Sequence, residues 1–359
     1  MVLSAERRQA LLQAKLTALV RQGWDDAPPE DGTLGTFPAG ATLIHGDRGW
    51  VLGENPDRTV GAALAWATKA GLAELHLIVP GGAGAVARRA AQFSLPVSVW
   101  IPAGPAEPSA LAPAPPEPLG PPTDTPSGFD LGRLEPVLAR LGDIGLDVVV
   151  EHGLVLGEIL GLELVRVEPG PEGEPVVSVG VGRHDRHARS LLDPAGLVPW
   201  EDQARQAMVE VRRRRRADGP AHPARLLSPE RWLRSVLVAR PDLAGALRLA
   251  PFPPPSARRD LRVPCPAPAI GVGADGAPVA VVCSSGVDLE VVPVAADVRA
   301  QAAHAGGVES VTVVLPAGDD LPAMRALAAL LAEPVEVRTV PADWRRFGPA
   351  GSGGGLGTL

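Results

Sequence analysis

Hydrophobic residues recur along this chain at two spacings and predict alternating helices and strands. Between Ala5 and Gln22, Leu11, Leu12, Leu16, Leu19 and Val20 share one face at helical spacing. Between Thr42 and Pro102, the pattern predicts a hairpin around residues 46–49, then a helix, a strand, a second helix and a second strand. The first hundred residues therefore predict an α/β unit.

A similar order of elements returns near the end of the chain. Residues 278–293 predict two apolar strands around a turn, and a helix, strand, helix and strand follow as far as Pro341. The segment AELHLIVPGG aligns with VESVTVVLPAG, and LPVSVWIPA aligns with EPVEVRTVPA. We therefore predict a divergent internal repeat of Thr42 to Pro102 and Val279 to Pro341. The alternative is that short alanine-rich α/β segments are alike in composition alone.

The middle segment, residues 128–250, has a different pattern. Leu131 to Gly145 predicts a helix, and three predicted strands follow at residues 146–153, 157–169 and 174–182. Helical spacing then returns in three stretches up to residue 247. The sequence thus predicts an α/β protein in which two small α/β repeats flank an α+β core of a helix, three strands and a helix.

Proline-rich stretches separate these segments. Residues 103–127 contain nine prolines, each of which removes a backbone hydrogen-bond donor and fixes φ, so we predict a linker there. Residues 251–278 predict a second linker, and residues 348–359 predict a flexible tail. The predicted domains are therefore residues 1–102, 128–250 and 279–347.

Positive charge is concentrated in one part of an otherwise acidic chain. The formal net charge is −7, which argues against a globally basic nucleic-acid coat protein. Between Gln203 and Arg262, however, 14 arginines stand against 5 acidic residues. The run Arg212, Arg213, Arg214, Arg215 and Arg216 repels itself unless an anionic surface neutralises it. We therefore predict that this run contacts nucleic-acid phosphates or an acidic protein.

Composition predicts a bacterial protein of the cytoplasm. The chain is rich in alanine, glycine, proline and arginine, as chains encoded by GC-rich genomes are. Its two cysteines have no metal-ligand spacing, its N-terminus is charged, and no apolar run is long enough to span a membrane. Neither a Walker loop nor a full dinucleotide fingerprint is present, so we predict no cofactor.

The stretch SVGVGRHDRHARSLL, Ser178 to Leu192, offers an anion site at the end of a predicted strand. Successive glycine N–H groups before a helix can hold a phosphate, which gives as candidate residues Gly180, Gly182, Arg183 and Arg186. The alternative is that the two glycines permit a tight turn from strand to helix.

The same stretch contains residue types that bind metals. His184, Asp185 and His187 could act with His152 or Glu158, because imidazole and carboxylate are suitable ligands for zinc. On a helix, however, Asp185 points away from the face that His184 and His187 share. Asp185 is also a favourable residue in a first helical turn, so we predict no metal centre.

The order of a helix, three strands and a helix resembles the core of the restriction-endonuclease-like nucleases. That resemblance implies an acidic residue on the second strand and an acid, a spacer and a lysine on the third, which together bind a divalent metal. Glu158 and Glu163 lie on the predicted second strand. The third strand has the sequence Val177-Ser178-Val179-Gly180 instead, and no lysine lies between residues 128 and 250. The resemblance is therefore to a degenerate core.

Two functions follow from these patterns. The first is a non-catalytic scaffold or accessory protein that binds an anionic partner through its arginine-rich middle domain. The second is a metal-dependent nuclease with a migrated active site that uses Glu158, Glu163 and His184. Convergence or separation of these three side chains in the fold distinguishes the two functions.

Overall fold

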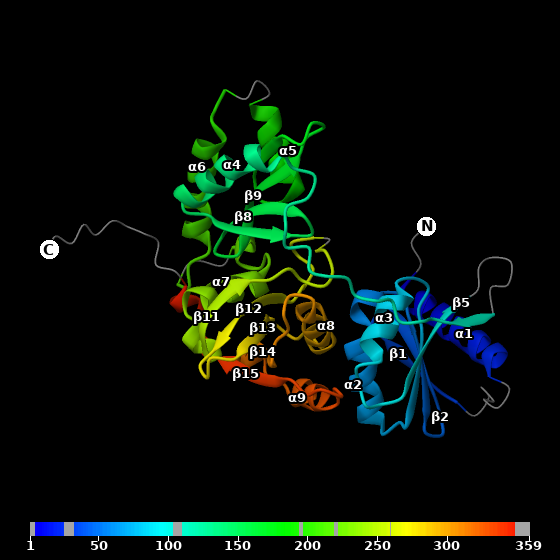
Figure 1. Cartoon of the computed structure of the whole chain (residues 1–359). Helices are drawn as coiled ribbons and strands as arrows, with labels where there is room; N and C mark the ends of the chain where they lie inside the picture. Colours follow the sequence, from blue (N-terminus) through cyan, green and yellow to red (C-terminus); the bar gives the residue numbers. More distant parts are fainter. Residues whose placement is uncertain are drawn as a thin grey trace. The chain divides into compact units, whose positions relative to one another are not determined.

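The computed structural model describes residues 4–24, 32–102, 110–193, 197–218, 222–258 and 260–348, which adopt an α/β fold (Figure 1). The chain divides into two compact units. Unit 1 comprises Met1–Leu119, Leu289–Asp297 and Leu321–Val335, and unit 2 comprises Gly120–Asp288, Val298–Asp320 and Glu336–Leu359. Within the described ranges, no helix is long and apolar enough to cross a membrane.

Unit 1 is built on a six-stranded sheet in the order β1-β2-β3-β4-β5-β6. Its strands are β1 (Thr33–Phe37), β2 (Gly40–His45), β3 (Arg48–Gly53), β4 (Glu74–Ile78), β5 (Val97–Pro102) and β6 (Leu111–Pro113). The pairs β3/β4 and β4/β5 are parallel, and the other pairs are antiparallel. Helix α1 (Ala5–Gly23) covers one face, and α2 (Val60–Ala70) and α3 (Ala83–Ala90) cover the other (Figure 1).

The predicted apolar face of α1 packs on this sheet with one exception. Leu12, Leu16, Leu19 and Val20 form a core with sheet residues that include Trp50, whereas Leu11 is 54% exposed. The hairpin predicted around residues 46–49 is the β2/β3 pair. Helix α1 therefore packs on the sheet through four of its five predicted apolar residues.

Unit 1 also contains the first part of a later helix, α8 (Val291–Ala303), and the whole of α9 (Pro322–Ala329). The carboxylate of Asp297, which is buried, accepts hydrogen bonds from Arg88 Nε at 2.9 Å and Arg89 Nε at 2.7 Å. Phe93 and Leu331, which follow α3 and α9, form an antiparallel bridge. Segments more than 200 residues apart in sequence are thus joined within this unit.

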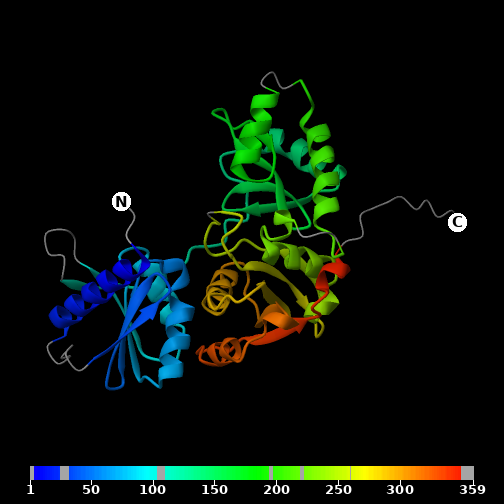
Figure 2. The ribbon, with the colours of Figure 1, turned by 180° about the vertical axis from the view of Figure 1, so that it is seen from behind.

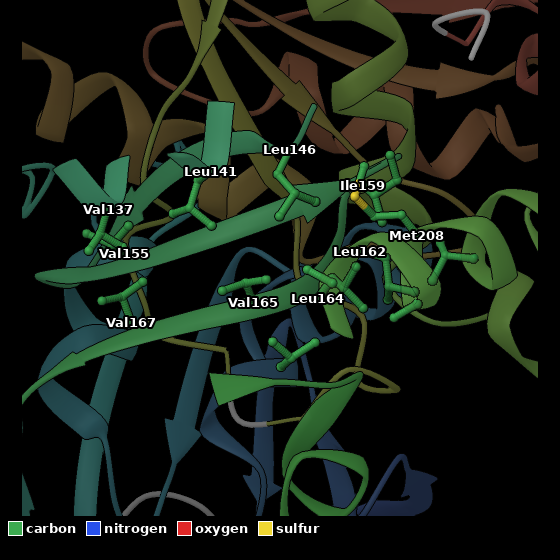
Figure 3. Packing of buried hydrophobic residues seen from close by; sticks show 14 of the residues in the cluster. Val137, Leu141, Leu146, Val155, Ile159, Leu162, Leu164, Val165, Val167 and Met208 are labelled. Atoms are coloured by element: carbon green, nitrogen blue, oxygen red, sulfur yellow. The ribbon is translucent and has the colours of Figure 1, made fainter. Parts of the chain in front are cut away.

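The predicted middle domain of unit 2 contains a four-stranded antiparallel sheet in the order β10-β9-β8-β7. Its strands are β7 (Asp147–Glu151), β8 (Leu154–Ile159), β9 (Leu162–Pro169) and β10 (Pro175–Val179). Its helices are α4 (Leu131–Asp143), α5 (Gly182–Leu192) and α6 (Trp200–Arg214). Leucines and valines of α4 and the sheet form one apolar core with Met208 of α6 (Figure 3).

This sheet has one strand more than the sequence predicts. The predicted strand at residues 157–169 is a hairpin, because Leu160 and Gly161 have φ values of +52° and +69° and form the turn between β8 and β9. A left-handed leucine is uncommon, and the apolar run across it resembles one continuous strand. The core is therefore a helix, four strands and a helix, a departure from the order on which the nuclease resemblance was based.

A second, five-stranded sheet of unit 2 has the order β11-β12-β13-β14-β15 (Figure 2). Its strands are β11 (Ala246–Pro251), β12 (Ala267–Gly273), β13 (Pro278–Cys283), β14 (Ser310–Pro316) and β15 (Glu336–Val340). Helix α7 (Pro229–Ala239) packs on this sheet through Trp232, Leu233, Val236 and Leu237. Short 3-10 turns lie at Pro56–Arg58, Pro223–Arg225, Pro241–Ala244, Ala317–Asp319 and Trp344–Phe347.

Two predicted boundaries differ from the structure. Helix α7 and strand β11 fall in the predicted middle domain, yet their apolar residues belong to the core of the five-stranded sheet. Strand β12 falls in the predicted second linker and pairs with both β11 and β13. Pro268 of β12 has no N–H to donate, but its carbonyl still accepts a hydrogen bond, from Phe252 N at 3.0 Å. The predicted tail, apart from Gly348, lies outside the described residues.

Strands β1 to β5 of the first sheet and the five strands of the last sheet share one topology. Each begins with three antiparallel strands and continues with two parallel strands, and a helix lies between successive parallel strands. The hairpin predicted at residues 278–293 is not formed, because residues after 290 begin α8; β12 and β13 form the hairpin instead. The internal repeat stays a prediction. If the β12/β13 hairpin corresponds to the β2/β3 hairpin of the first copy, the second copy begins at β12.

Gly161 provides a test of how tightly the β8/β9 turn meets α7. A Cβ on Gly161 would overlap the backbone of Arg231 and Trp232, whereas Gly276, also at positive φ (+86°), has nothing within 4 Å of its Cβ position. We expect Gly276→Ala to lower the free energy of unfolding by about 1 kcal/mol, the strain of a left-handed alanine. We expect Gly161→Ala to cost about 2 kcal/mol more because of the overlap. Urea unfolding measures both, and equal losses would contradict this packing.

Candidate functional site

Glu158, a candidate nuclease carboxylate, lies on β8 in a buried cluster of four charges. Arg231 Nη1 donates to Glu158 Oε1 at 2.6 Å, and Arg234 Nη2 donates to Glu158 Oε2 at 2.9 Å. The same two arginines of α7 also hydrogen bond to Glu151 of β7. We call these four residues the ion quartet. Both oxygens of Glu158 are occupied by guanidinium groups.

The ion quartet combines two positive and two negative side chains, and all four are buried. Burial opposes ionisation of Glu151, but the charges of Arg231 and Arg234 outweigh it and lower the pKa of that carboxyl. Burial likewise opposes the charge of Arg231, but Glu151 and Glu158 outweigh it and raise its pKa. Glu151 and Arg231 therefore stay charged at neutral pH, and Glu151 and Glu158 each pair with both arginines of α7.

Glu163, the second candidate carboxylate, is also paired with arginines. It lies on β9 directly opposite Glu158 and is buried. Arg166 donates to both of its oxygens at 2.8 and 3.0 Å, and Arg186 Nη1 donates to Oε1 at 2.8 Å. Two facing carboxylates would repel each other across the strands, and each is neutralised by arginines of its own.

His184, the third nuclease candidate, is exposed on α5, as is His187. Across the part of the chain that the structure describes, no group of three or more His, Cys, Asp or Glu side chains could hold a metal ion. The structure therefore brings Glu158 and Glu163 to adjacent strands but does not gather them with His184 into a metal site.

In the predicted anion site at Gly180 to Arg186, backbone N–H groups already donate hydrogen bonds to other groups of the chain. Gly180 N donates to Leu164 O at 2.8 Å, and Val181 N donates to Asp185 Oδ2 at 2.8 Å. Arg186 pairs with Glu163, and Gly182 has the φ value of +74° that a tight turn into α5 requires. Arg183 is exposed. These contacts match the alternative explanation of the sequence, a glycine-permitted turn.

The arginine run ends α6 and has one member that differs from the rest. The helix stops at Arg214, which pairs with Glu210, and Arg216 pairs with Asp218. Arg213 is exposed. Arg215, by contrast, is 1% exposed, and its guanidinium lies over the ring of Trp232 with 4.6 Å from Cζ to the ring centroid.

Arg215 is a buried cation without a carboxylate partner in the described chain. Its Nη2 donates to Ser228 O at 3.4 Å, a long contact, while Nε and Nη1 have no hydrogen-bond partner among the described atoms. Burial lowers the pKa of Arg215 to about 9; the charges of Glu158 and Glu230 oppose this shift, and the charge of Arg345 adds to it. The side chain is therefore still charged at neutral pH, in a place that disfavours the charge.

Arg215 lines a cavity of about 730 Å³ in unit 2. We name it the arginine pocket after five of its lining residues, Arg212, Arg215, Arg216, Arg345 and Arg346. Arg345 stacks on Trp344 at 4.3 Å and on Trp232 at 5.3 Å, and its buried Nε also has no hydrogen-bond partner in the described residues. The pocket thus joins the end of the predicted arginine run to arginines 130 residues later.

Acidic residues of the arginine pocket do not balance its arginines. The carboxylates in its lining are Asp147 and Asp218. Asp218 is engaged by Arg216, and burial, together with the charge of Glu158, raises the pKa of Asp147. An excess of positive charge therefore faces the cavity.

Sequence reasoning identified part of this site. It selected Arg212, Arg215 and Arg216 as a run but gave no reason to separate Arg215 from its neighbours. It missed Arg345 and Arg346, and it missed the arginines of the ion quartet, although an arginine pair spaced by three in the apolar sequence RWLRSVLV was a signal for buried ion pairs. Comparison of the chain with protein-family models, curated protein sequences and solved structures found no match.

Arg215 and Arg234 permit a matched test of buried charge, since each is 1% exposed. We expect Arg234→Met to lower the free energy of unfolding by about 3 to 5 kcal/mol, because Glu151 and Glu158 lose a counterion inside the protein. We expect Arg215→Met to leave stability equal or higher, because it removes an uncompensated charge. Urea unfolding at low anion concentration measures the difference, and a comparable loss in both variants would show that Arg215 is compensated in the fold.

Proposed function

We propose that this protein is a non-catalytic binding protein that holds an anionic partner in the arginine pocket. The observation that carries the proposal is Arg215, a buried guanidinium with no carboxylate partner in the described chain and two nitrogens without acceptors. A protein rarely keeps such a group unless something compensates it. An oxyanion in the pocket supplies the missing countercharge.

The chemistry of the lining supports an anion over a neutral ligand. Guanidinium groups present planar donor forks that match oxyanions, and their attraction strengthens where water is excluded. Arg215, which is buried, lies over the ring of Trp232. Arg345, which is half-buried, is a second cation over the same ring. Two like charges on one ring repel each other, and an anion near both relieves that repulsion.

No observation favours the alternative of a metal-dependent nuclease. Glu158 and Glu163 each accept hydrogen bonds from two arginines, and a carboxylate so engaged has little capacity left for a divalent cation. We therefore propose a non-catalytic binding function in which the partner binds in the arginine pocket, and not on the exposed arginines of α6.

Thermal unfolding in sulfate and in chloride at matched ionic strength tests the proposal. A ligand that binds only the folded state at 100 times its Kd stabilises it by about 2.7 kcal/mol, so sulfate should raise the Tm of the wild type by several degrees. We expect Arg345→Ala to lose most of this shift, because Arg345 lines the pocket.

Arg213→Ala is the matched control for this test. It also removes one arginine, but Arg213 is exposed and does not line the arginine pocket. Sulfate stabilises folded proteins in general, and that part of the shift is common to all variants. The proposal fails if Arg345→Ala responds to sulfate as fully as Arg213→Ala does.

A further inference from the structure

The charges in the arginine pocket indicate how much negative charge its ligand carries. Arg216 pairs with Asp218, and Arg346 pairs with Asp343 at 3.6 Å. Among the residues with described side chains, Arg212, Arg215 and Arg345 form no ion pair with a carboxylate. Three such cations against Asp147, the remaining carboxylate of the lining, leave an excess of two positive charges, which favours a ligand group with two negative charges over a single carboxylate.

The pocket also has a buried end and an exposed end. Arg215 and Trp232 are each 1% exposed, Arg212 and Arg345 are half-buried, and Arg216 and Arg346 are exposed. The charged group of the ligand must therefore project from its carrier to approach the buried end. A phosphodiester of a nucleic-acid duplex lies along the outside of a rod and carries one charge, so it meets neither requirement.

A phosphate monoester meets both requirements. It stands at the end of the molecule that carries it, has a charge of about −1.5 to −2 at pH 7 and presents three acceptor oxygens. Guanidinium groups bind such an oxyanion with paired hydrogen bonds. The cavity of about 730 Å³ lies within the range of small-molecule pockets, about 300 to 1,000 Å³.

We infer that the arginine pocket recognises a phosphate monoester carried by a small molecule. This inference rests on the anion-binding function proposed above and names the ligand of that same site. Arg212 and Arg345 hold the phosphate oxygens at the middle of the pocket. Arg215 attracts the dianion from the buried end, and the exposed arginines face the rest of the ligand.

Methyl phosphate and dimethyl phosphate are the probes that test this inference, because they differ by one methyl group and one negative charge. At pH 7.5, we expect methyl phosphate to bind the full-length protein at least tenfold more tightly than dimethyl phosphate in titration calorimetry. The preference should disappear in Arg345→Ala and persist in Arg213→Ala. Equal affinity for the two esters in the wild type would overturn the inference.

Acid provides a second arm of the experiment. The second pKa of a phosphate monoester is about 6, so its dianion fraction falls about tenfold from pH 7.5 to pH 5, and the affinity should fall with it. Sulfate keeps its charge over this range and reports any change in Asp147 and Asp218, the carboxylates that face the pocket. An equal loss of affinity for sulfate and methyl phosphate would show titration of the protein and would count against the dianion.

A third arm separates the source of the phosphate and the two proposals from each other. A single-stranded oligonucleotide with a 5′-phosphate that binds through Arg345, without binding of methyl phosphate, would overturn the small-molecule carrier. Sulfate binding that depends on Arg345 without preference for the monoester would leave the anion-binding function and refute this inference. Absence of Arg345-dependent binding of every anion would refute both.

Discussion

Compensation of buried charge is the constraint on which unit 2 depends. Taking a guanidinium group out of water costs several kcal/mol unless a carboxylate and its hydrogen bonds replace the solvent. The ion quartet satisfies this requirement, because Glu151 and Glu158 supply two carboxylates to two arginines of α7. Unit 1 has a related arrangement at Asp297, whose buried carboxylate pairs with both Arg88 and Arg89. Buried arginine therefore serves both units as a way of joining distant segments.

The same constraint separates structural charges from the proposed binding site. Glu158 and Glu163 have carboxylates of the kind that bind metals, but their arginine partners make them counterions within the fold. Arg215 has an ordinary sequence position within a run, but it is buried and forms no ion pair with a carboxylate of the described residues. The distinction depends on which groups are compensated, and composition alone does not contain that information.

Local pattern predicted much of the fold, and long-range pairing accounts for the rest. The α1 stripe, the β2/β3 hairpin and strands β4, β5, β14 and β15 follow from spacing that neighbouring residues determine. The turn at Leu160 was missed because apolar residues continue through it, and β12 was missed because prolines precede it. The arginine pocket could not be predicted from the sequence at all. Arg215 and Arg345 lie 130 residues apart and come together by stacking on the same ring, that of Trp232.

The lining of the arginine pocket comes from three well-separated parts of the chain. These parts are residues 145–160, residues 212–232 and residues 345–348. During synthesis on a ribosome, the first two parts emerge long before the third. The proposed ligand can therefore meet a complete pocket only after synthesis has passed residue 348 and this third part has joined the other two.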